Sequence, residues 1–77
     1  MNLVFAATAA EAAAYARQHR LEDFVTYSDL AVALTGFRIQ AGDEIFLLPS
    51  VSDEVVQVIQ RQAASLRLRP RIHRPLT

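Results

Sequence analysis

Apolar positions along the chain fall into two patterns: short continuous runs, and longer stretches with helical spacing. Residues 3–7 (LVFAA) and 45–48 (IFLL) are continuous apolar runs, which is typical of strands buried on both faces of a parallel sheet. Residues 24–27 (FVTY) mix apolar and polar side chains, which suits an edge strand. The pattern therefore predicts two central strands and one edge strand.

Three further stretches are predicted to be helical. Residues 9–20 are rich in alanine, the best helix former, whose small side chain lets a helix lie close to a sheet. Residues 30–35 form a brief helix that Ser28 and Asp29 can cap. Residues 53–66 repeat apolar side chains at helical spacing, with acidic residues in the first turn.

The C-terminal segment, residues 66–74 (LRLRPRIHR), alternates apolar and basic side chains until Pro70 interrupts the pattern. It is therefore either an edge strand or a flexible tail. The element order β-α-β-(short α)-β-α implies a mainly parallel sheet with right-handed crossovers. We expect a half-Rossmann-like α/β fold with strand order 2-1-3, or 2-1-3-4 if this segment pairs. Residues 1–66 then form a single domain, and residues 67–77 its Arg-rich edge strand or tail.

Length and composition bound the class of protein. Seventy-seven residues make one domain, and a chain this short buries only about 60–65% of its unfolded surface. No cysteine is present to cross-link it, so self-association is a route to extra stability. No apolar run approaches the ~20 residues that span a bilayer, and the start lacks the basic region of a secretory signal. We expect a cytoplasmic protein without membrane contact.

The formal net charge of zero hides an uneven distribution. Residues 1–60 hold all eight acidic side chains and carry −5, whereas residues 61–77 hold five arginines and carry +5. All eight basic residues are arginine, which indicates a high-GC genome. Such asymmetry between two parts of a chain points to a charged contact surface.

The junction after the first strand raises the question of an anion site. A phosphate-binding loop needs glycine-rich backbone and usually a lysine, and the sequence between Phe5 and Glu11 has neither. Thr8 and Glu11 instead fit a capping box, in which the Thr8 hydroxyl bonds the backbone N–H of residue 11. We interpret the junction as a capped helix start.

A small-molecule site, if the chain has one, is expected where the strand order reverses. Ligands of open α/β sheets favour the crevice beyond the carboxyl ends of the strands at that point. The polar side chains predicted to line it are Thr8, Ser50, Ser52 and Asp53. All four are equally well explained as helix caps, so no cofactor is expected.

Side chains for catalysis are few. His19 lies near the end of the first helix, where it can meet the last carbonyls, and His73 lies in the basic segment. Neither has metal-ligand spacing to another ligand. Ser28 and Ser52, each followed by Asp, look like caps with no histidine aimed at them. The sequence therefore indicates a non-enzymatic protein with no metal site.

Asp43 and Glu44 precede the second apolar strand. The magnesium-binding acids of nucleotide hydrolases follow their strand, so this pair stands on the wrong side. We interpret it as a solvated turn that blocks extension of the strand.

The arginines of the C-terminal segment are the candidate contact residues: Arg67, Arg69, Arg71 and Arg74. Arginines release counterions when they neutralise phosphates, so they could give weak, salt-sensitive nucleic-acid binding. No aromatic residue lies among them to stack bases, and no groove-reading motif is present. The competing interpretations are an edge that resists aggregation, and a basic tail that docks on acidic surface of its own or a neighbouring protomer.

The helix predicted at 53–66 has a wide apolar face, which we assign to the core: Val55, Val56, Ile59 and Leu66. A sheet of three or four strands with two full helices and one short helix leaves some apolar surface uncovered. Such a surface marks an oligomer or partner interface.

Three stretches, "VFAATAAEAAAYAR", "FVTYSDLAVALTGFRI" and "DEIFLLP", together resemble small uncharacterised Rossmann-like proteins of phages that infect high-GC bacteria. The likeness covers roughly residues 3–60 and lies in the pattern of elements. It implies no catalytic residue. It implies a phage accessory protein that acts in the host cytoplasm by contact with a host or phage macromolecule. The sequence thus favours a self-associating interaction module, with nucleic-acid binding and a degenerate nucleotide-binding fold as alternatives.

Overall fold

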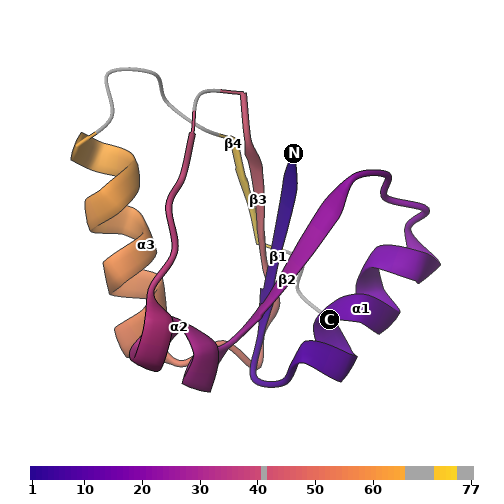
Figure 1. Cartoon of the computed structure of the whole chain (residues 1–77), viewed down its shortest axis with the longest axis horizontal. Coiled ribbons are helices and arrows are strands. Elements are labelled where there is room, and N and C mark those ends of the chain that lie inside the picture. The colour runs from indigo at the N-terminus through magenta and orange to yellow at the C-terminus, as the bar shows by residue number, and fades with distance from the viewer. Residues whose placement is uncertain (41, 66–70, 75–77) are drawn as a thin grey trace.

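The computed structural model describes residues 1–40, 42–65 and 71–74 and contains a four-stranded sheet (Figure 1). The strands are β1 (Asn2–Ala6), β2 (Phe24–Ser28), β3 (Glu44–Leu47) and β4 (Arg71–His73). All neighbours pair in parallel, in the order β2-β1-β3-β4. This confirms the α/β fold and the four-strand form of the predicted order. At 71–73 the C-terminal segment is an edge strand, whereas residues 66–70 lie outside the described residues.

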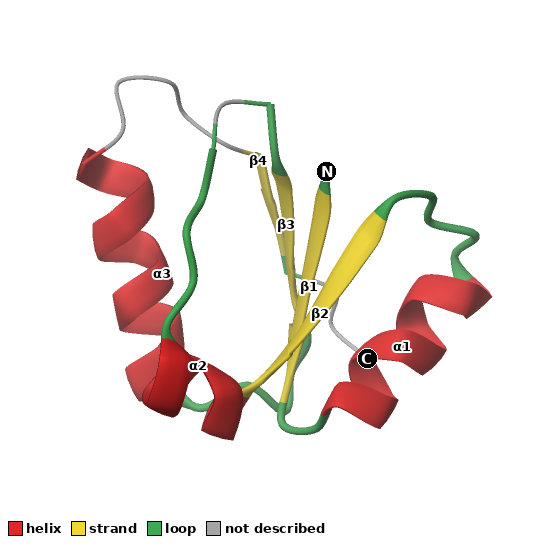
Figure 2. Ribbon diagram, in the orientation of Figure 1, coloured by secondary structure: helices red, strands yellow, loops and turns green. Residues whose placement is uncertain are grey.

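Helices cover both faces of the sheet (Figure 2). They are α1 (Ala9–Gln18), α2 (Asp29–Thr35) and α3 (Asp53–Ser65). The ribbon shows α1 on one face and both α2 and α3 on the other. The bounds agree with the sequence patterns to within two residues.

Two of the helix ends have local causes. The last turn of α1 closes at His19, whose backbone N–H bonds the carbonyls of Tyr15 and Arg17. The next residue, Arg20, has φ +54°, which no helix continues. The end of α2 is Gly36 at φ +71°, a conformation that glycine adopts without a steric penalty.

The strands β1 and β3 are central, as predicted, and each is buried on both faces. In β1, Leu3 and Phe5 belong to the core under α2 and α3, while Val4 and Ala6 belong to the core under α1. Continuous apolar sequence in these strands is therefore a consequence of helices packing on both sides.

The core under α1 depends on small side chains. Ala12 and Ala16 of α1 are fully buried against a surface that includes Val4 and Phe46. A helix whose inward residues are alanines can lie close to a sheet, because no long side chain separates the two backbones. This confirms the role assigned to the alanine-rich stretch.

The core under α2 and α3 is larger and carries the bulky side chains. Phe5 is its centre: its ring stacks on Tyr27 of β2 with centroids 4.9 Å apart and meets the edge of Phe37 at 5.0 Å. From α3, the predicted apolar face is buried at Val55, Val56 and Ile59, whereas Leu66 lies outside the described residues.

Candidate functional site

All three helices start at the carboxyl ends of the parallel strands, so their N-termini lie along one end of the sheet. Each start has a hydroxyl cap. The Oγ1 of Thr8 accepts from Glu11 N at 3.2 Å, and the Oγ of Ser28 accepts from Ala31 N at 3.1 Å. The Oγ of Ser52 accepts from the backbone N–H of residue 55 at 3.4 Å. The capping interpretation is confirmed for these three hydroxyls. It is wrong for Ser50, whose hydroxyl bonds another loop, and for Asp53, which is the first residue of α3 rather than its cap.

The remaining polar groups of this crevice tie its loops together. The Oγ of Ser50 accepts from Ala7 N at 3.0 Å, which joins the loop after β3 to the loop after β1. The Asp29 carboxylate accepts from Ser52 N at 3.2 and 3.4 Å, which joins the starts of α2 and α3. Sequence patterns did not indicate these bonds, because their partners are far apart along the chain.

The charge at this edge is acidic. The first turns of the three helices contain Glu11, Asp29, Asp53 and Glu54. These carboxylates stabilise the helix N-termini, where the macrodipole is positive, and they repel a phosphate from the same place. Of the residues predicted for a ligand crevice, Thr8, Ser50 and Ser52 thus serve the fold, and Asp53 adds to the negative charge.

Four rings form a row on the α1 side of the sheet, with one of the two histidines at each end. His19 lies on Tyr15 with ring centroids 4.1 Å apart, and Tyr15 lies 5.9 Å from Phe46. His73 stacks on Phe46 at 4.6 Å with planes 12° apart. His19 was expected to meet the last carbonyls of α1 through its position, and its backbone does so while its ring packs on Tyr15.

His73 also faces Glu44, the first residue of β3. The Nε2 of His73 lies 3.8 Å from Glu44 Oε2, and both side chains are about two-fifths exposed. An ion pair this exposed contributes little to stability. No group of three or more potential metal ligands occurs among residues 1–40, 42–65 and 71–74.

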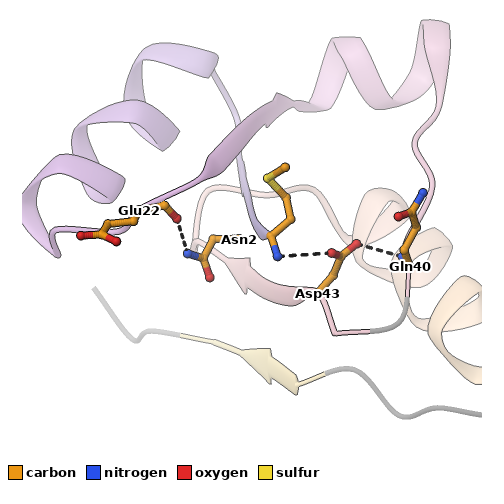
Figure 3. A network of polar contacts seen from close by, with 5 residues as sticks. Asn2, Glu22, Gln40 and Asp43 are labelled. Carbon is orange, nitrogen blue, oxygen red and sulfur yellow. Dashed lines mark hydrogen bonds and ion pairs between the residues drawn. The ribbon is translucent and has the colours of Figure 1, made fainter.

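The interpretation of Asp43 and Glu44 as a turn before the strand requires a correction, because Glu44 is the first residue of β3. Asp43 was interpreted as part of a solvated turn, yet it is 9% exposed. Its Oδ2 accepts from Gln40 N at 2.8 Å, and its Oδ1 lies 3.6 Å from the amino group of Met1 (Figure 3). Nearby, Asn2 Nδ2 donates to Glu22 O at 2.7 Å. Asp43 is a structural acid that holds the amino ends of the central strands together.

The described residues include part of the Arg-rich end. Arg71 and Arg74 are exposed at β4 and just beyond it, while Arg67 and Arg69 lie outside the described residues. The register pairs Arg71 of β4 with Glu44 of β3, so an acidic residue lies beside Arg71 in the neighbouring strand.

A pocket of about 490 Å³ lies beside the connection between α2 and β3. Its lining residues are Phe37, Arg38, Ile39, Gln62 and Ser65. Both amide atoms of Gln62 bond the backbone of this connection, so they are not available to a ligand. The pocket therefore offers an apolar wall, one arginine and the hydroxyl of Ser65, which donates to Gln62 O.

Several apolar side chains are exposed, and packing within the fold does not account for their presence at the surface. On α2, Leu30 is 67% and Leu34 is 74% exposed, and on β2 Val25 is 38% exposed. The two leucines are four residues apart, so they share one side of the helix. Sequence analysis anticipated uncovered apolar surface but did not locate it on α2.

No helix formed by the described residues is long and apolar enough to cross a bilayer. Comparison with protein-family models, curated proteins and solved structures found no match to this chain.

Proposed function

We propose that this chain is a non-enzymatic protein-interaction module that associates with itself. One observation carries the proposal: Leu30 and Leu34 project from the same side of α2 with most of their surface in water. A short helix that exposes two leucines on one side has an apolar surface that a protein partner can cover. At the carboxyl ends of the strands, the helix starts are capped by hydroxyls of the chain itself and carry acidic side chains. This arrangement supports protein contact rather than catalysis.

The energetics favour a reversible complex. Full burial of a leucine side chain contributes about 1.5–3 kcal/mol, and association costs roughly 4–15 kcal/mol in lost translational and rotational freedom. The two leucines of α2 thus need further contacts to support a stable dimer. The dimer is expected to form in the micromolar to millimolar range of protein concentration.

Sedimentation velocity over that concentration range tests the proposal. The wild-type chain is expected to shift from monomer to dimer, and the double variant Leu30→Gln/Leu34→Gln to remain monomeric. Ala64→Gln, at an exposed position of α3, is the matched control and keeps the wild-type shift. A wild-type chain that stays monomeric at millimolar concentration contradicts self-association.

A host or phage protein is the further partner that we propose for the same surface. Capture of a bacterial protein by the wild-type chain, lost in the leucine double variant and kept in Ala64→Gln, supports this partner. Equal capture by the wild-type chain and both variants contradicts it.

Nucleic-acid binding through the Arg-rich end is the second candidate, and the exposure of Arg71 and Arg74 favours it. Fluorescence titration with short DNA and RNA at low salt tests it. Binding that weakens steeply with salt, and weakens in Arg71→Ala/Arg74→Ala but not in Arg17→Ala/Arg20→Ala, supports this function. Equal affinities of the two double variants contradict it.

A further inference from the structure

We propose that β2 is the dimer seam: it pairs antiparallel with β2 of a second copy, which joins the two sheets into one. This inference rests on the proposed self-association and assigns it a surface. Figure 1 shows β2 at the side of the sheet, between α1 and α2, and the strand order places it at an edge.

The edge of β2 presents backbone groups suited to such pairing. Asn2 N donates to Asp23 O at 3.0 Å, so the odd-numbered residues of this segment direct their backbone groups toward β1. The even-numbered residues Phe24 and Thr26 consequently direct theirs away from the sheet. Antiparallel pairing centred on Thr26 lets the two copies of this residue exchange both of their backbone hydrogen bonds.

The two edges of the sheet differ in how they are protected. β4 has three residues, begins with Arg71 and is followed by Arg74, and its sequence is flanked by prolines at 70 and 75. Charges, prolines and short length are the devices that keep an edge strand from pairing. β2 has five residues, FVTYS, with no charge and no proline. It is the edge that remains open to another strand.

The seam brings complementary side chains together on the face that carries α2. In a register centred on Thr26, Val25 stands opposite Tyr27 of the second copy. A β-branched residue facing an aromatic one is a favourable cross-strand pair. The two-fold axis runs perpendicular to the sheet, so α2 of each copy lies on this same face beside the seam. Its exposed Leu30 is thus placed near apolar surface of the other copy.

The opposite face carries α1, which packs on β1 and β2 and so lies next to the seam. Its acidic Glu11 is at the N-terminal end and its basic Arg17 at the C-terminal end, both exposed. The two-fold axis runs the two α1 helices antiparallel, so the N-terminal end of each lies toward the C-terminal end of the other.

The ends of β2 limit the seam to a few residues. Asp23 has φ +48°, which turns the chain out of the strand before Phe24. At the other end, Ser28 is the cap of α2, so its carbonyl accepts the first bond of that helix. A short seam agrees with a dimer that dissociates on dilution.

Disulfide trapping tests the register, and the chain has no cysteine of its own. In the proposed seam the two Thr26 Cα atoms are about 5.5 Å apart, within reach of a disulfide bond. The two Val25 Cα atoms are about 8 Å apart, because they are offset by two residues along the paired strands. This distance exceeds the limit of about 7 Å between Cα atoms for a disulfide bond. Thr26→Cys is therefore expected to cross-link at least about tenfold faster than Val25→Cys.

Amide hydrogen exchange on the wild-type chain gives a readout that needs no variant. The N–H group of Thr26 is expected to gain protection as concentration rises, while those of Val25 and Tyr27 bond β1 at every concentration. Together the two measurements separate the possible failures. A dimer that lacks both the cross-link at position 26 and the gain in protection overturns the seam and leaves self-association standing. A strict monomer overturns both.

Discussion

Gln62 of α3 bonds the backbone of Ile39 in the connection between α2 and β3. Its Oε1 accepts from Ile39 N at 3.0 Å, and its Nε2 donates to Phe37 O at 2.9 Å. One side-chain amide thus replaces a neighbouring strand for this segment, and it fixes the connection against the end of α3. Ile39, only 3% exposed, is held in the core by this pair of bonds.

Replacing this amide is expected to destabilise the fold. Gln62→Ala leaves the N–H of Ile39 and the carbonyl of Phe37 without their partners, and each unsatisfied group costs about 1–3 kcal/mol when buried. Because both are part-buried, we expect the free energy of unfolding to fall by about 2 kcal/mol in urea denaturation. Gln60→Ala, at an exposed position of the same helix, is the control and should change it by less than about 0.5 kcal/mol. Equal unfolding midpoints for the two variants would contradict this role.

Asp43 is expected to matter more for stability than any exposed carboxylate. Asp43→Ala removes the charged acceptor of the Gln40 N–H and the ion-pair partner of the Met1 amino group, and a hydrogen bond to a charged group contributes about 1.5–3 kcal/mol. We expect a loss of about 2 kcal/mol in the free energy of unfolding. Glu22→Ala is the matched control, because Glu22 is exposed and takes part through its backbone carbonyl. An unfolding midpoint that moves equally in both variants argues against a structural Asp43.

The ring of His73 is expected to contribute more to stability than its Nε2 atom, which lies 3.8 Å from Glu44 Oε2. Its Nε2 is buried and has no hydrogen-bond partner among the described residues, while its ring stacks on Phe46. His73→Phe keeps the stack and removes the buried polar atom, so its stability should equal or exceed that of the wild type. His73→Ala removes the stack, and we expect it to lose about 0.5–1.5 kcal/mol. Thermal unfolding checks both variants, and a His73→Phe chain as unstable as His73→Ala would show that Nε2 is needed.

The sequence was sufficient for the features that depend on local pattern. Continuous apolar runs identified β1 and β3 as central, and mixed polarity identified β2 as an edge. The cap residues Thr8 and Ser28 were recognisable because a hydroxyl before a helical pattern has a direct physical role, whereas for α3 the pattern left Ser50 and Ser52 as alternatives. The position of β4 was left open between strand and tail, since pairing at β3 depends on the whole sheet.

The features that sequence analysis missed depend on partners far apart in the chain. In the sequence, Gln62 looks like a solvent-facing helix residue. Nothing in the neighbouring sequence indicates that its side chain bonds the backbone at Phe37. Asp43 follows a turn glycine and reads as a surface residue until the start of β1 is placed beside it. The exposure of Leu30 and Leu34 could not be located either, because helical spacing shows which residues share a side but not whether that side is covered.

The close approach of α1 to the sheet gives the last prediction. Ala16 has no exposed surface and packs in the core that contains Val4 and Phe46. Ala16→Leu adds three carbon atoms where no space remains, so α1 must move away from β1 or the side chain must adopt a strained rotamer. Overpacking of this kind costs about 1–3 kcal/mol, whereas Ala64→Leu at an exposed position of α3 should change stability by less than about 0.5 kcal/mol. Urea denaturation of the two variants measures the difference, and equal stabilities would mean that α1 packs more loosely than its alanines indicate.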